Sequence, residues 1–111
     1  MMFGFSKHRK AQLTEELRRI APELARLGVE RVWLAGDLIE ERVTPESQLE
    51  LVLVHPTREP FHRRSDFFVT HLRPTVGTQF VVYTPEEFDT LQDRDDILVR
   101  ARRSGGELHD E

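Results

Sequence analysis

The sequence predicts an α+β domain in which helices pack on a small mixed β-sheet. The expected elements follow the order helix, strand, strand, helix, strand, helix, helix, which favours such a sheet. The expected helices carry apolar residues at steps of three and four, whereas the strands are short apolar runs. No repeat or low-complexity linker interrupts the 111 residues, so residues 1–111 are predicted to form a single domain.

The first helix is predicted from about Lys7 to Leu27. Its apolar residues form one stripe at helical spacing, made of Leu13, Leu17, Ile20, Leu24 and Leu27. Gly28 can adopt the left-handed conformation that often follows a helix. Pro22 lies inside the stripe, so a kink or a break is expected near Ile20.

Three strands are predicted. The first runs from Arg31 to Ala35, and the third from Gln79 to Tyr83. The second, Leu49 to Val54, is an almost uninterrupted run of leucine and valine, which is typical of a strand buried on both faces.

The remaining helices are marked mainly by their ends. After a turn bracketed by Pro56 and Pro60, Phe61 to Leu72 is loosely helical. The run Thr84-Pro85-Glu86-Glu87 predicts a helix start with a capping box. Helices are therefore expected over about 85–92 and 94–104, and Gly105-Gly106 would end the last one before a polar tail.

Composition excludes several classes of protein. The chain contains no cysteine, which excludes disulfides and thiolate metal sites and is compatible with the cytoplasm. The apolar runs are too short to cross a membrane. A net charge of −4 gives no general attraction to nucleic acid. A nucleic-acid-binding module is the alternative suggested by Arg100, Arg102 and Arg103, but aromatic residues do not alternate with these arginines.

The segment between the first two strands carries the most specific pattern. Gly36 follows a strand, Pro45 and Ser47 end a polar loop, and Leu49 and Leu51 open the next strand. This arrangement resembles the G-S-x-A-R-G-x-x-x-P-x-S-D-x-D-L signature of the minimal nucleotidyltransferase domains. These belong to the DNA polymerase β-like superfamily and include the antitoxins of HEPN–MNT pairs. The preceding LTEELRRIAPELARLGVERVWLAG, the later QFVVYTPEEFDTL and the terminal ILVRARRSGGEL are similar to further parts of these domains.

The resemblance implies nucleotide transfer assisted by divalent metal ions. Two carboxylates on one strand and a third on its neighbour would bind the ions, because hard cations such as Mg²⁺ require oxygen ligands. The corresponding residues are Gln48, Glu50 and Gln79. Two of them are neutral amides, so Glu50 is the only residue of the three that could bind a metal.

The nucleotide-binding part of the signature is changed as well. Asp37 replaces the serine after Gly36, and Glu40 and Glu41 stand where the family has arginine and glycine. These carboxylates are expected to repel a triphosphate. Together with Glu46 they are interpreted as a solvated acidic loop, with a docking surface for a basic partner as the alternative.

A binding or regulatory module without catalysis is therefore expected, with no cofactor. The resemblance implies a protein partner, either a helical HEPN-like protein or a second copy of the chain. The alternative is a weak nucleotidyltransferase that uses Mg²⁺, in which Glu50 acts with a second carboxylate such as Asp66 or Asp37.

Overall fold

Strand β2 is the central element of the fold. It pairs in parallel with β3 on one side and antiparallel with β1 on the other, and β1 also pairs antiparallel with β4, so the sheet order is β3-β2-β1-β4. The computed structural model describes residues 2–109. Its elements are α1 (Met2–Arg26), β1 (Arg31–Ala35), β2 (Leu49–Val54), η1 (Phe61–Arg63), α2 (Arg64–Leu72), β3 (Thr78–Tyr83), α3 (Pro85–Leu91), α4 (Asp96–Arg103) and β4 (Glu107–Leu108). The predicted α+β class with a small mixed sheet is confirmed.

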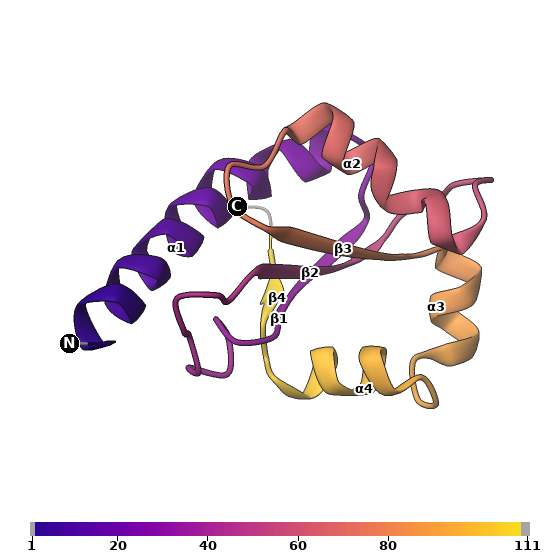
Figure 1. Cartoon of the computed structure of the whole chain (residues 1–111). Helices are drawn as coiled ribbons and strands as arrows, with labels where there is room; N and C mark the ends of the chain where they lie inside the picture. Colours follow the sequence, from indigo (N-terminus) through magenta and orange to yellow (C-terminus); the bar gives the residue numbers. More distant parts are fainter. Residues whose placement is uncertain (1, 110–111) are drawn as a thin grey trace.

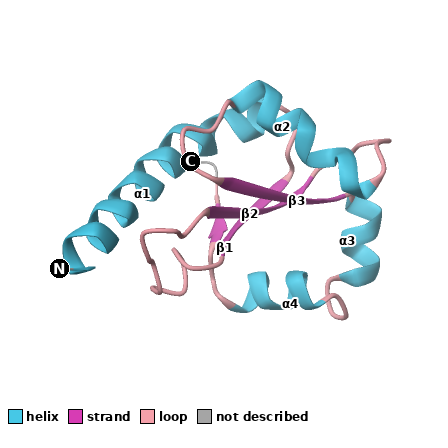
Figure 2. Ribbon diagram, viewed as in Figure 1, coloured by secondary structure: helices cyan, strands magenta, loops and turns pink. Residues whose placement is uncertain are grey.

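The helices cover both faces of the sheet (Figures 1 and 2). Because strand side chains alternate between faces, Leu51 and Leu53 of β2 point toward α1 and α2, whereas Val52 and Val54 point toward α3 and α4. The α1/α2 side buries Leu13, Ile20, Leu24, Phe68, Leu72 and Phe80 among others. The α3/α4 side buries Trp33, Tyr83, Phe88, Leu98 and Ala101. Burial of β2 on both faces explains its nearly uniform apolar sequence.

A kink or a break was expected near Ile20, and the break is wrong, because α1 is one helix from Met2 to Arg26. Pro22 has no backbone N–H, so the Arg18 carbonyl lacks the hydrogen bond that it would normally accept from position 22. Both residues are exposed, so water can solvate that carbonyl. The helix also begins earlier than predicted. Its first buried described residue is Leu13, and the turns before it extend beyond the globule (Figure 1).

Two other elements differ from the prediction. Residues 61–72 form a 3-10 turn, η1, followed by α2, in place of one helix. The expected polar tail contains β4, whose Glu107 carboxylate accepts two hydrogen bonds from Arg31, each 2.9 Å long. This bidentate pair and the short ladder with β1 hold the chain end against the sheet.

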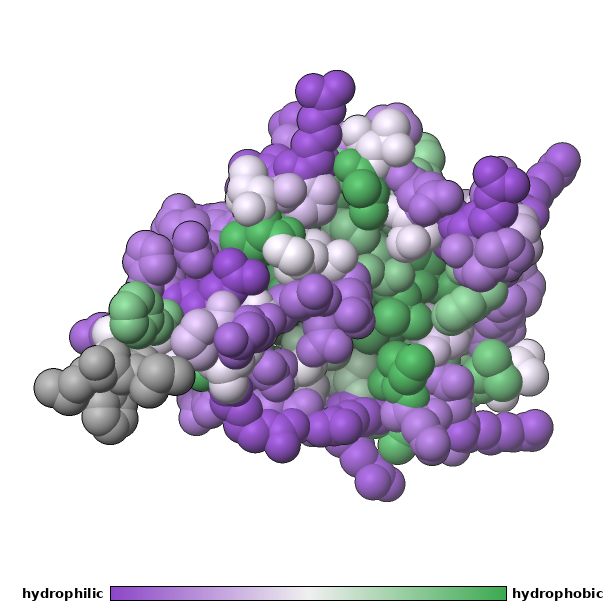
Figure 3. All heavy atoms as spheres, viewed as in Figure 1, coloured by the Kyte–Doolittle hydropathy of each residue, from purple (hydrophilic) through white to green (hydrophobic). Residues whose placement is uncertain are grey.

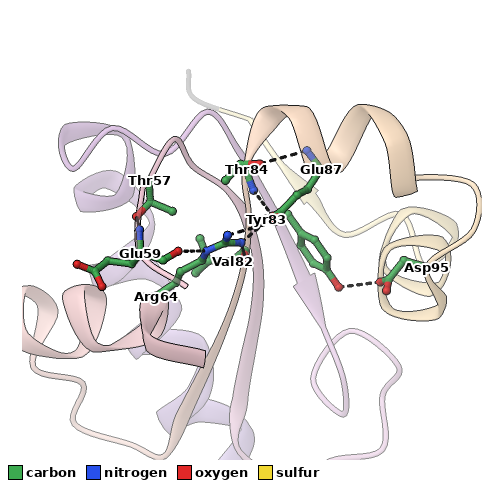
Figure 4. Close-up of polar contacts among 8 residues, drawn as sticks. All are labelled: Thr57, Glu59, Arg64, Val82, Tyr83, Thr84, Glu87 and Asp95. Carbon is green, nitrogen blue, oxygen red and sulfur yellow. Dashed lines mark hydrogen bonds and ion pairs between the residues drawn. The ribbon is translucent and has the colours of Figure 1, made fainter. Parts of the chain in front are cut away.

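The predicted glycine after α1 and the predicted capping box of α3 are both present, and Asp95 adds a cap that was not predicted. Gly28 has φ +96° just after α1. Thr84 and Glu87 form the reciprocal capping box at α3, and Asp95 caps α4 by accepting from the Leu98 amide at 3.1 Å. Asp95 also accepts a 2.7 Å hydrogen bond from the Tyr83 hydroxyl (Figure 4). Burial, with this bond to a carboxylate, raises the pKa of Tyr83. In the described part of the chain, no helix combines the length and apolarity needed to cross a membrane.

Candidate functional site

A pocket of about 350 Å³ lies where the loop after β1 meets α4. It opens at the carboxyl end of β1 and the amino end of β2, where the sequence places the altered nucleotide-binding signature. Its walls combine acidic, basic and small apolar side chains. They are formed by Ala35, Gly36, Asp37, Glu40, Arg42, Glu50, Ile97, Arg100, Ala101 and Ser104.

Glu50 reaches this pocket because Gly36 has no side chain. Gly36 has φ +74°, a conformation that favours glycine. A Cβ atom at this position would overlap the Glu50 carboxylate. Ala35 is the register partner of Glu50 on β1, which places the carboxylate directly beside the start of the loop. Gly36 therefore has two functions: it turns the chain and it makes room for Glu50.

Replacing Gly36 by alanine tests this arrangement. The left-handed backbone alone should lower the free energy of unfolding by about 1–2 kcal/mol, and the overlap with Glu50 should add to that loss. Gly28→Ala is the matched control, because its φ is also positive but a new Cβ would meet His55 Cε1 at an ordinary 3.4 Å. In urea unfolding, Glu50→Ala should reduce the cost of Gly36→Ala. Equal costs at positions 28 and 36, with no coupling to Glu50, would contradict the overlap.

The other two motif positions are not brought to the pocket. The Gln48 side chain lies against Gly77, where a Cβ would meet its Cγ at 3.1 Å. Gln79 is exposed on β3, although it is the register partner of Glu50 and lies on the same side of the sheet. Neither residue lines the pocket. The structure thus unites Glu50 with Gly36 and Asp37 and leaves Gln48 and Gln79 outside.

Ser47 and Asp37 form a hydrogen bond across the loop between β1 and β2. The buried Ser47 hydroxyl donates to Asp37 Oδ2 at 2.7 Å, and its oxygen accepts from the Thr44 amide at 2.8 Å. Arg9 Nε donates to the Ser47 carbonyl at 2.8 Å, which fastens the loop to α1. Glu41 has φ +57°, a backbone conformation that favours glycine. The loop therefore has a left-handed turn at the position where the family signature has glycine.

Glu40 is held between two arginines at the pocket mouth. Its Oε1 lies 2.7 Å from Arg42 Nη2 and 2.8 Å from Arg100 Nη2 of α4. The hydrogen bond from Arg100 lowers the pKa of Glu40. Within the loop interpreted as acidic and solvated, Asp37 and Glu40 are half-buried and have hydrogen-bonding partners, whereas Glu41 and Glu46 are exposed. Three carboxylates and two guanidinium groups leave the lining with a net charge of −1.

The donor set does not fit a pair of divalent cations. Glu50 offers one carboxylate, Asp37 is engaged by Ser47, and Glu40 is engaged by arginines. Arg42 and Arg100 would place further positive charge beside a metal ion. Among residues 2–109, no three His, Asp or Glu side chains converge in a way that could hold a metal.

The two carboxylates considered as companions of Glu50 lie in different places. Asp37 lines the same pocket. Asp66 is exposed on α2, which packs on the opposite face of the sheet. Sequence reasoning missed the roles of Arg42 and Arg100. The first had no distinguishing signal, and the second belongs to a basic cluster that any solvated helix face could carry.

Comparisons with protein-family models, with curated proteins and with solved structures gave no match to this chain.

Proposed function

We propose that this chain is a nucleotidyltransferase-like domain that has lost catalysis and works as a binding or regulatory module through protein contacts. One observation carries the proposal: the pocket at the signature loop presents a single carboxylate, Glu50, that has no hydrogen bond or ion pair within residues 2–109. It lies beside the Arg42–Glu40–Arg100 network. A two-metal reaction requires several carboxylates on the same ions. The glycine-like backbone of Glu41 and the cradle at Gly36 support descent from a catalytic loop of this kind.

The expected partners are proteins. The resemblance favours a helical HEPN-like protein, as in an antitoxin pair, or a second copy of the chain. Arg100, the main basis for a nucleic-acid interface, is bonded to Glu40, and Arg102 is bonded to the Gln92 carbonyl and to Asp93. These pairings reduce the positive charge available to phosphates, which supports the protein-binding alternative.

Restoring the carboxylates provides the sharpest test. The wild-type chain is expected to bind neither Mn²⁺ nor Mg²⁺–ATP in calorimetric titrations, because most anionic ligands are absent. Position 79 is the register partner of position 50, and positions 48 and 50 share one side of the chain, so carboxylates at all three would lie on the same side of the sheet. The triple variant Gln48→Asp/Glu50→Asp/Gln79→Asp should therefore gain Mn²⁺ binding, readable from the paramagnetic relaxation of water. Gln12→Asp, on the exposed side of α1, adds charge elsewhere and should gain nothing. Micromolar, metal-dependent binding of ATP by the wild type would overturn the proposal.

A weak nucleotidyltransferase remains the second candidate, because Asp37 shares the pocket with Glu50. It predicts transfer of label from ATP to a co-purified protein. Glu50→Ala should abolish this transfer, whereas Asp66→Ala, on the opposite face, should leave it intact. Transfer that survives Glu50→Ala would eliminate Glu50 as the metal ligand.

A further inference from the structure

Strand β3 has one free edge along which backbone groups point outward. In its parallel ladder with β2, the Leu49 amide donates to the Gly77 carbonyl and the His55 amide donates to the Tyr83 carbonyl. The odd-numbered residues of β3 therefore bond to β2, and the amides and carbonyls of Thr78, Phe80 and Val82 face the other way. No further strand covers this side of the described sheet.

Only the far end of this edge is capped. The buried Arg64 donates from Nη1 to the Val82 carbonyl at 3.0 Å (Figure 4). Within residues 2–109, the outward amide and carbonyl of Phe80 have no hydrogen-bond partner. Unpaired donors and acceptors along the edge of a sheet are a template for another strand.

Strand β3 and its flanking residues also lack the charges that usually prevent such pairing. No residue between Arg73 and Glu86 is charged, although charged residues make up 32% of the chain. The strand itself, Thr78–Tyr83, contains neither proline nor glycine. Figure 1 views the sheet from the β3 side, and Figure 3 shows in the same view that apolar atoms gather over β3 within a polar rim. A neutral, apolar edge strand is suited to strand addition.

Helix α2 adds exposed apolar surface next to the same edge. Phe68 packs on Phe80 of β3, with ring centroids 5.6 Å apart. Phe67 stacks on His55 at the end of β2, so it lies on the inner flank of the helix. Val69 follows Phe68 on the opposite flank, toward the free edge, and is 47% exposed. A chain paired with β3 would cover this valine.

We propose that the β3 edge binds the β3 edge of a second copy, antiparallel, so that two sheets join into one. The edge is self-complementary, since Thr78 and Phe80 each offer one outward donor and one outward acceptor, and no residue of β3 itself is charged. Arg64 occupies the edge at Val82, so the pairing centres on Gln79, with Gln79 of the two copies side by side. This inference rests on the proposed role in protein contacts and names the surface for self-association.

Charge reversal at Gln79 tests the pairing. By light scattering after gel filtration, wild-type mass should rise with concentration from 13.0 kDa toward twice that value. Gln79→Lys and Gln79→Glu should each raise the dimer dissociation constant at least about tenfold, because like charges would face each other across the axis. An equimolar mixture of the two variants should dimerise again. Gln12→Lys, which adds the same charge on α1, should leave the dimer intact.

Hydrogen exchange of the backbone amides locates the contact. The Phe80 amide should be protected in the wild type at high concentration and exchange faster in Gln79→Lys, with circular dichroism confirming that the variant is folded. Wild type that stays at 13.0 kDa at every concentration would overturn the inference, as would a dimer indifferent to both Gln79 variants. Mg²⁺–ATP titration of the same samples reads the proposed function separately, because metal-dependent ATP binding by a dimer would overturn only the loss of catalysis.

Discussion

Arg64→Met is expected to lower the free energy of unfolding by about 3 kcal/mol. The Arg64 side chain is buried and joins three parts of the fold. It donates to the Glu59 carbonyl at 2.9 Å, to the Val82 carbonyl at 3.0 Å, and to both Glu87 carboxylate oxygens at 2.6 and 3.1 Å (Figure 4). Methionine has a similar length but no donor, so the Glu59 and Val82 carbonyls lose the guanidinium and the Glu87 carboxylate keeps only its bond from the Thr84 amide. Urea unfolding followed by tryptophan fluorescence gives the change directly.

Neighbouring variants separate this network from a general loss of charge. Arg63→Met removes the same charge from an exposed position and should change stability by less than about 0.5 kcal/mol. Glu87→Gln should cost less than Arg64→Met, since the Glu87 side chain is 37% exposed and can be solvated. Arg64→Lys should recover little, because an ammonium cannot reproduce the planar fork. If Arg63→Met and Arg64→Met are equally costly, the buried network does not stabilise the fold.

The elements that the sequence predicted correctly are those that depend on residues close together in the chain. Thr84 and Glu87 mark the start of α3 with a reciprocal capping box, which requires only two residues three positions apart. Gly28 ends α1 through a conformation that favours glycine. The apolar runs at Arg31–Ala35 and Leu49–Val54 coincide with β1 and β2. Short apolar runs of this length are typical of strands buried in a sheet.

Features that depend on distant partners escaped prediction. Strand β4 has only two residues and is held by its ladder with β1 and by the bond from Arg31 to Glu107. The sequence of these two residues alone does not predict a strand. Arg64 stands in the buried stripe of α2 with Phe68 and Leu72, yet only the fold shows which carbonyls it reaches. The same limit applies to the residues that line the pocket. Gly36 and Glu50 were identified by their spacing along the chain, whereas Arg100 belongs to α4, which is distant in sequence.

The second large effect is expected at Glu16, whose stabilising contribution should depend on pH. Glu16 is 4% exposed, and its carboxylate accepts from Arg19 at 2.6 and 2.8 Å and from the Thr75 amide. Hydrogen bonding from Arg19, against the opposing effect of burial, lowers its pKa from 4.5 to about 2. The carboxylate thereby ties α1 to the segment that leads into β3.

The direction of the pH dependence follows from the lowered pKa of Glu16. The unfolded chain binds the proton more readily, so the contribution is fully present above about pH 4.5 and is lost as the pH falls through about 2. The difference in pKa corresponds to about 3 kcal/mol at neutral pH. Glu16→Gln should therefore be less stable than wild type by about that amount at pH 7, and the two proteins should converge toward pH 2.

Glu15→Gln is the matched control for this experiment. Glu15 and its partner Arg18 are each 71% exposed, so their ion pair should contribute little at any pH. Thermal unfolding of the three proteins between pH 7 and about pH 2.5 separates the cases. Wild type and Glu15→Gln should lose stability together, and Glu16→Gln should show a shallower dependence because its buried side chain no longer titrates. A Glu16→Gln curve parallel to wild type at all pH values would mean that Glu16 is not held as a carboxylate between Arg19 and Thr75.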